Sequence, residues 1–197
     1  NVVTGLYAPD SGSFELGGKH YEPTAVHRVA EAGIARTFQN IRLFGDMTAI
    51  ENVMVGAVFG ADHLHGKTAR QRAGEALEFV HFPLPLDTPA EQLNAVQLKR
   101  LDLARALACG PKLLLLDELA SGLTPSELED MMALIRIIRE KGITVIVVEH
   151  IMRVIKGICD RVFVLQYGTK IAEGSTDEVL QDPVVIEAYL GKSELGH

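Results

Sequence analysis

The sequence predicts an α/β fold, with a parallel sheet flanked by helices. Patterns typical of strands alternate with patterns typical of helices along most of the 197 residues, as parallel sheets require. Residues 113–116 are four consecutive leucines, apolar on both faces, which is typical of a strand in the middle of such a sheet. A helical pattern over 126–141 leads to a second apolar, β-branched run at 143–148. These three segments form the centre of the predicted fold.

Composition narrows the class of protein. Hydrophobic residues make up 47% of the chain and charged residues 23%, a balance typical of a globular protein. The formal net charge of −7 disfavours binding of nucleic acid or of an anionic membrane through a basic surface. Cys109 and Cys159 stand apart from any C-x-x-C pair, which favours a reduced compartment. No apolar run approaches the roughly 18 residues of a membrane span and no signal peptide is recognisable, so we expect a cytoplasmic protein.

The N-terminal third contains short elements. Residues 1–5 have the pattern of a helix that ends at Gly5, and Gly17-Gly18 predicts a turn between two short strands. The expected order is a strand at 13–16, a second at 20–22, a helix over 24–33 and a strand at 34–38. Gln39 follows that strand directly.

Helices dominate the middle of the chain. Thr48 and Glu51 form a capping-box pattern that predicts a helix start. Further helices are expected over 67–80 and 91–108, separated by a proline-rich loop at 81–89. Beyond the strand at 143–148 we expect a short helix at 151–158, a hairpin of strands at 161–166 and 169–172, and two terminal helices, the second of which begins at Pro183.

Two adjacent carboxylates follow the run of leucines. Asp117 and Glu118 come at the C-terminal end of the predicted central strand, the edge at which open α/β sheets bind ligands. An ionised carboxylate beside an apolar core needs a partner, and a hydrated Mg²⁺ that also binds phosphate is a common one. The alternative is a strand that simply ends in solvated acids. His150 follows the neighbouring strand and is expected at the same edge.

These motifs, and the order in which they follow one another along the chain, resemble the nucleotide-binding domain of an ABC transporter. Residues 113–118 resemble the Walker B strand, which implies that Asp117 holds Mg²⁺ through water and that Glu118 polarises the attacking water as general base. His150 resembles the switch histidine that senses the γ-phosphate of ATP. Gln39 resembles the Q-loop glutamine, which contacts Mg²⁺ or the attacking water.

Residues 35–52 and 185–191 are similar to the ATPases of branched-chain amino-acid importers. This resemblance implies an ATP-hydrolysing subunit on the cytoplasmic face of the membrane, partnered by a second ABC ATPase and by transmembrane permease subunits. It also implies a P-loop NTPase-like core formed by residues 1–47 and 93–197. Residues 48–92 would be a helical subdomain whose cleft holds a coupling helix of the permease.

The sequence departs from the family pattern in three places. No G-x-x-x-x-G-K-[ST] loop occurs; in the family it precedes the segment matched by residues 1–5, so we expect an N-terminally incomplete chain that is inactive alone. Residues 93–97 read LNAVQ where the family has LSGGQ or LSYGQ, which leaves Asn94 and Gln97 to contact the ATP of the partner subunit. Val96 replaces a glycine there, and a positive φ at this position would be strained. Leu119 and Thr124 also replace the usual Pro and Asp or Asn.

Two alternative hypotheses about the function of this protein remain open. A degenerate, non-hydrolysing module that docks a partner ATPase or a membrane subunit would explain the missing loop and the altered signature. A soluble ABC ATPase of DNA repair or translation is disfavoured by the short insert at 48–92, which lacks coiled-coil heptads, and by the acidic net charge.

Overall fold

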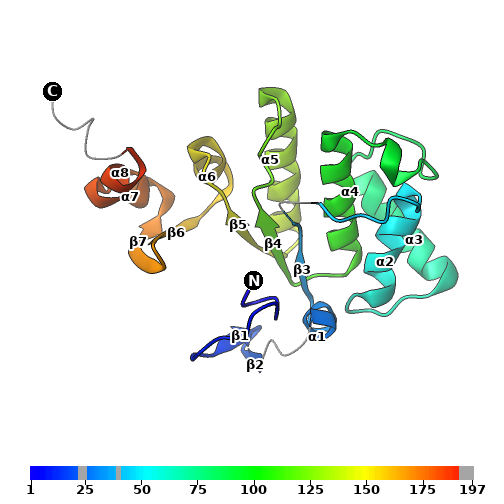
Figure 1. The fold of residues 1–197 in the computed structure, drawn as a ribbon, viewed down its shortest axis with the longest axis horizontal. Helices are drawn as coiled ribbons and strands as arrows, with labels where there is room; N and C mark the ends of the chain where they lie inside the picture. The colour runs from blue at the N-terminus through cyan, green and yellow to red at the C-terminus, as the bar shows by residue number, and fades with distance from the viewer. Residues whose placement is uncertain (22–25, 39–40, 191–197) are drawn as a thin grey trace. The chain divides into compact units, whose positions relative to one another are not determined.

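The computed structural model describes residues 1–21, 26–38 and 41–190, and the chain divides into two compact units, Asn1–Val148 and Glu149–His197. Figure 1 shows the elements of each unit. The first unit is built on a parallel sheet of three strands in the order β3 (Ile34–Arg36), β4 (Leu113–Asp117) and β5 (Thr144–Val148). Its register pairs Ile34 with Leu113 and Asp117 with Val148. The α/β class and the parallel sheet predicted from the sequence are confirmed.

The central strand is the most buried of the three. Leu114 and Leu116 are fully buried, because β4 has a hydrogen-bonded neighbour on each side and apolar packing on its faces. Helix α5 (Pro125–Glu140) packs against β5 and turns an apolar face inward. Thr124, which departs from the family pattern, is the N-cap of this helix and forms a capping box with Glu127.

Short elements precede the sheet in the first unit. Asn1–Leu6 forms a turn in which Gly5 N–H donates to the carbonyl of Val2 (3.0 Å) and Leu6 N–H to that of Asn1 (3.1 Å), the pattern with which helices end. Strands β1 (Phe14–Leu16) and β2 (Lys19–Tyr21) form the predicted antiparallel hairpin. Helix α1 (Val26–Glu31) leads through Gly33 into β3.

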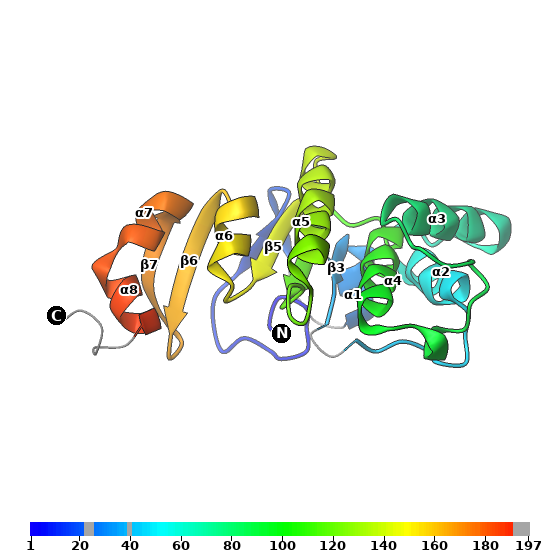
Figure 2. The same cartoon turned by 90° about the horizontal axis from the view of Figure 1, so that it is seen from above.

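Three helices that follow β3 and precede β4 in the sequence pack on one another (Figure 2). They are α2 (Ala49–Phe59), α3 (Gly66–Phe79) and α4 (Ala95–Ala108). The capping box of Thr48 and Glu51 is confirmed. Helices α2 and α4 touch through their backbones, because a Cβ at Gly56 would lie 2.2 Å from the carbonyl oxygen of Arg105. A side chain at this position would force the helices apart.

The start of α4 differs from the prediction by several residues. The helix expected from residue 91 begins at Ala95, after a single 3₁₀ turn, η1 (Ala90–Gln92). The backbone is extended at Leu93 and Asn94, and the Asn94 side chain caps the new helix. The Asn94 cap therefore separates η1 from α4, whereas the apolar pattern of the sequence predicts one continuous helix.

The second unit consists of α6 (Met152–Ile158), an antiparallel pair of strands, β6 (Arg161–Gln166) and β7 (Thr169–Ser175), and helices α7 (Thr176–Gln181) and α8 (Pro183–Leu190). Strand β7 is longer than predicted, and its register with β6 shifts between Val164 and Leu165. Ser175 caps α7, and the Thr176 hydroxyl donates to the carbonyl of Cys159 (2.7 Å). As predicted, α8 begins at a proline.

A buried amide fixes the start of α2. The side chain of Asn52 is 0% exposed, accepts a hydrogen bond from Phe44 N–H (2.9 Å) and donates to the carbonyls of Phe44, Met47 and Thr48. A buried amide with this many partners specifies the conformation of the turn that enters the helix.

We expect Asn52→Leu to lower the free energy of unfolding by about 2–3 kcal/mol, because it removes the four hydrogen bonds of a buried amide, including the one that Phe44 N–H donates to it. Urea unfolding measures the change. Gln71→Leu, at an exposed position of α3, is the control and should shift the free energy by less than about 0.5 kcal/mol. Equal losses in the two variants would contradict this role of Asn52.

Candidate functional site

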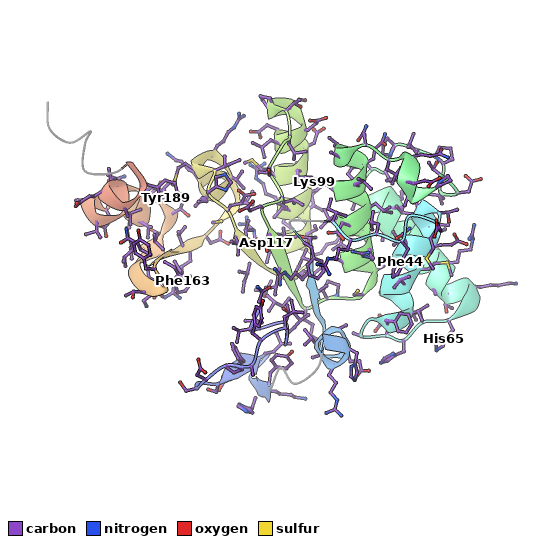
Figure 3. All side chains as sticks on the ribbon, viewed as in Figure 1. Phe44, His65, Lys99, Asp117, Phe163 and Tyr189 are labelled. Atoms are coloured by element: carbon purple, nitrogen blue, oxygen red, sulfur yellow. The ribbon has the colours of Figure 1, made fainter. Side chains whose placement is uncertain are left out.

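The acidic pair lies where the sequence predicts it, at the C-terminal end of β4. Asp117 is the last residue of this strand, and its Oδ2 accepts a hydrogen bond from Nη2 of Arg36 on β3 at 2.8 Å. The Asp117 side chain remains 26% exposed (Figure 3). The Arg36 guanidinium also lies 5.0 Å from the centre of the Phe38 ring. A carboxylate and a cation therefore reach solvent together at the edge of the parallel sheet.

Glu118 has a strained backbone. Its φ of +46° lies in the left-handed region, which a glutamate rarely adopts and which costs on the order of 1 kcal/mol. Its N–H donates to the carbonyl of Val148 at the end of β5 (3.0 Å), and its own carbonyl accepts from Ser121 N–H (3.3 Å). The chain therefore turns sharply at Glu118, and its side chain lies at a different angle from that of a residue in a continuing strand.

Lys99 contacts the loop that follows Glu118. Its Nζ donates to the carbonyls of Leu119 (2.7 Å) and Ser121 (2.5 Å). The apolar pattern of α4 places Lys99 away from the core but cannot indicate these partners, which lie 20 and 22 residues further along the chain. Lys99, Asp117 and Glu118 line one small hollow at the end of the sheet.

The same hollow contains a buried carboxylate that sequence analysis missed. Asp102 is 2% exposed, and its Oδ2 accepts from Phe38 N–H at 3.2 Å. Its Oδ1 pairs with Nη2 of Arg105 at 2.5 Å, and Nη1 of Arg105 donates to the carbonyl of Arg42 at 2.7 Å. Burial raises the pKa of Asp102 above its ordinary value, and Arg105 and the Phe38 N–H offset only part of that shift. Helix α4 is thereby bound to the residues just after β3 and to the segment that begins at residue 41.

The signature-like segment 93–97 caps a helix. Asn94 Oδ1 accepts from Gln97 N–H (3.0 Å), and Gln97 Oε1 accepts from Asn94 N–H (2.9 Å). This reciprocal capping box uses the side-chain oxygens of the two residues that the family resemblance assigns to nucleotide contact. Val96 lies in the first turn of α4 and has a helical backbone, so the positive φ considered from the sequence does not occur.

The structure does not place two further predicted site residues relative to this hollow. His150 belongs to the second unit; it is exposed, and its carbonyl accepts from the Tyr189 hydroxyl (3.0 Å). Gln39 lies outside the residues that the structure describes. The structure thus brings Asp117, Glu118 and Lys99 together, and the roles of His150 and Gln39 stay predictions.

The donors at this edge suit a magnesium ion better than a metal held by protein ligands alone. Within residues 1–21, 26–38 and 41–190, no group of three or more His, Cys, Asp or Glu side chains could hold a metal. Mg²⁺ is commonly held by one or two carboxylates, with water and phosphate oxygens as the remaining ligands, and Asp117 offers one partly exposed carboxylate.

In the described part of the chain, no helix is long and apolar enough to cross a bilayer.

The burial of Asp102 predicts a pH effect on stability. Because its pKa is raised in the folded protein, the unfolded chain loses this proton first as pH rises. The free energy of unfolding should then decrease relative to that of Asp102→Asn, until pH exceeds the folded-state pKa. Urea unfolding of both proteins between about pH 3 and pH 8 tests this. If the stability of the wild type relative to the variant increased with pH, the Arg105 ion pair would outweigh burial and the prediction would be wrong.

Comparison with known proteins places the chain in a family. Residues 1–121 match the family described as ABC transporter, and residues 169–194 match the family described as branched-chain amino acid ATP-binding cassette transporter. The chain is 35% identical to the high-affinity branched-chain amino acid transport ATP-binding protein BraF of Pseudomonas aeruginosa. It is 34% identical to LivG, the corresponding protein of Escherichia coli. Each alignment covers 98% of this chain and 81% of the relative.

Solved structures agree with these matches. A nucleotide-free ATP-binding cassette of an ABC transporter superposes with a TM-score of 0.86 and 28% identity, over 98% of this chain and 82% of the other. A dimeric cassette in a post-hydrolysis state, bound to ADP and phosphate, superposes with a TM-score of 0.78 and 26% identity. This superposition covers 89% of this chain and 78% of the other. Together with the sequence matches, they show that the chain belongs to the ABC transporter family, as an ATP-binding subunit homologous to the ATPases of branched-chain amino-acid importers.

Proposed function

We propose that this protein hydrolyses ATP to power the import of branched-chain amino acids or similar small solutes. The observation that carries the proposal is the Asp117–Glu118 pair at the end of the central strand, in a chain 35% identical to BraF over nearly its full length. The family as a whole supports ATP hydrolysis. The solute class is supported by these relatives and by the match of residues 169–194 to the family described as branched-chain amino acid ATP-binding cassette transporter.

Asp117 would hold Mg²⁺ through water. When bound, Mg²⁺ neutralises charge that develops on the transferred phosphoryl group. Arg36 pairs with Asp117 at the same edge, and its guanidinium would attract the phosphates of the nucleotide. The exposed fraction of Asp117 leaves the carboxylate accessible to a hydrated ion.

Glu118 would act as general base and orient the attacking water. A base must lie within about 2.6–3.2 Å of the water that it activates, so the direction of its side chain matters as much as its charge. The left-handed backbone and the bond to Val148 set that direction. His150 would contact the γ-phosphate, and Gln39 would contact Mg²⁺ or the attacking water.

We expect Glu118→Gln to lower steady-state ATP hydrolysis by the assembled transporter at least 100-fold, with ATP binding retained, because the amide cannot take a proton from water. Phosphate release measures hydrolysis, and equilibrium binding measures affinity. Glu140→Gln removes a similar charge from the exposed end of α5 and should leave the rate unchanged. An unchanged rate in Glu118→Gln would contradict the general-base role.

A second ABC ATPase subunit would complete the site. Dimeric cassettes of known structure support an arrangement of two such subunits. In a head-to-tail dimer, Asn94 and Gln97 at the start of α4 would contact the ATP bound to the partner. Their capping box presents this helix N-terminus, whose N–H groups favour an anion.

The permease subunits would dock on an apolar cavity of about 470 Å³ in the first unit. Its lining includes side chains of α2 and of the segment before it, among them Val55, Phe59, Arg42 and Phe44. Phe44 and Phe59 are exposed. Residues 48–92 would act as the helical subdomain that grips a coupling helix, and this docking would hold the protein at the cytoplasmic face of the membrane.

We expect Phe59→Asp to abolish co-purification of the transmembrane subunits, because a charge in an apolar docking cavity is costly to bury. Leu86→Asp is the matched control, since Leu86 is exposed in the proline-rich loop and does not line the cavity. Complexes pulled down through a tag on this subunit give the measurement. Equal recovery of the permease with the two variants would place the docking surface elsewhere.

The non-hydrolysing alternative finds no support in these comparisons. It predicts that Glu118→Gln changes neither hydrolysis nor solute import, so the experiment on Glu118 also separates the two readings.

A further inference from the structure

We propose that Lys99 is a positioning residue for ATP hydrolysis: by binding two carbonyls of the loop after Glu118, it holds the strained turn that aims this side chain. The catalytic part of the inference rests on the proposed role of Glu118. The structural part, that Lys99 stabilises the turn, stands on the geometry alone. The two parts are separately testable.

The turn needs support from outside itself. A glutamate with φ of +46° persists only where surrounding contacts stabilise that conformation. Within the loop, two backbone hydrogen bonds, Ser121 N–H to Glu118 O and Leu123 N–H to Ala120 O, are both long, at 3.3 Å. The bond from Glu118 N–H to Val148 O anchors the turn to the end of β5. The other side meets α4.

Lys99 supplies the contact on that other side. Its ammonium group bonds to the carbonyls of Leu119 and Ser121, one and three residues after Glu118. A charged donor makes stronger hydrogen bonds than a neutral one, and the bond to Leu119, which is partly buried, is screened less than it would be in open water. Lys99, labelled in Figure 3, belongs to α4, a regular helix of 14 residues that provides a rigid support.

The other cations of α4 have similar contacts with different segments. Arg100 Nη1 donates to the carbonyl of Val80, the C-cap residue of α3, at 2.6 Å. Arg105 donates to the carbonyl of Arg42. Arg100 Nη2 also lies 3.8 Å from Oδ2 of Asp130 on α5. Removal of Arg100 therefore tests the loss of a cation from the same helix, with one carbonyl contact and one ion pair, and neither contact involves the loop after Glu118.

Loss of the Lys99 contacts should act on catalysis rather than on ATP affinity. If the turn relaxes, the Glu118 carboxylate spends less time within reach of the attacking water, and the chemical step slows. The side chains proposed to bind nucleotide are themselves unchanged in such a variant. A loss confined to the transition state lowers kcat and kcat/KM together and leaves KM unchanged.

The variants are Lys99→Met, Lys99→Arg and the control Arg100→Met. Methionine keeps an unbranched apolar chain but no charged donor, whereas arginine keeps a cation that can bond to carbonyls. Lys99→Gln replaces Lys99→Met if the latter does not fold. Each variant is made in the intact protein, and kcat and KM for ATP are measured in the assembled transporter. Hydrogen exchange of the backbone amides is followed by mass spectrometry without nucleotide.

Lys99→Met should speed exchange of the amides of Ser121 and Leu123 about tenfold and lower kcat about tenfold, with KM within about twofold. Lys99→Arg should have exchange rates and a kcat close to those of the wild type. Arg100→Met should instead speed exchange near Val80 and leave kcat unchanged. Unchanged exchange at Ser121 and Leu123 in Lys99→Met would overturn the structural part. Faster exchange with an unchanged kcat, or an equal fall of kcat in Arg100→Met, would overturn the positioning role.

The exchange measurement keeps this inference distinct from the proposed function. If Glu118→Gln hydrolyses ATP at the wild-type rate, the general-base role fails and the catalytic part of the Lys99 inference fails with it. The exchange result then still decides whether Lys99 holds the turn.

Discussion

The burial of one apolar strand between two parallel neighbours determines where chemistry can take place in this protein. Leu114 and Leu116 are excluded from water, so the charged residues that follow them must emerge at the carboxyl edge of the sheet. Hydrogen bonds to β3 and β5 fix this edge on both sides, and each neighbour also contributes a contact with the acidic pair. Arg36 on β3 binds Asp117, and Val148 on β5 binds the backbone of Glu118. The site is thus a consequence of the sheet register.

Features that depend on nearby residues could be predicted from the sequence. The capping box of Thr48 and Glu51 involves residues three apart, and the run of four leucines defines the buried strand by itself. The order of strands and helices and the position of Asp117 followed from the same local patterns. The family resemblance added the expected roles of individual residues, which no apolar pattern contains.

Features that depend on distant partners could not be predicted. The pattern of α4 gives no sign that Asp102 is buried, because the group that compensates for burial includes Phe38 N–H, 64 residues earlier in the chain. Lys99 is a similar case, since its partners are backbone carbonyls and leave no trace in the side-chain sequence. The left-handed backbone of Glu118 was also missed, because only glycine, asparagine and aspartate commonly signal such a conformation.

The contact between α2 and α4 at Gly56 has a mechanical consequence. Side chains between packed helices can change rotamer and absorb small displacements, but here the backbone of one helix lies directly against a carbonyl of the other. A displacement of α2 toward α4 would therefore move α4 directly, because no side chain lies between the two backbones at this point. Val55 and Phe59 line the apolar cavity on either side of this contact, and Arg105, whose carbonyl receives it, also holds Asp102 and Arg42. A load applied at the cavity wall would therefore reach the helix that braces the end of the sheet through this close backbone contact.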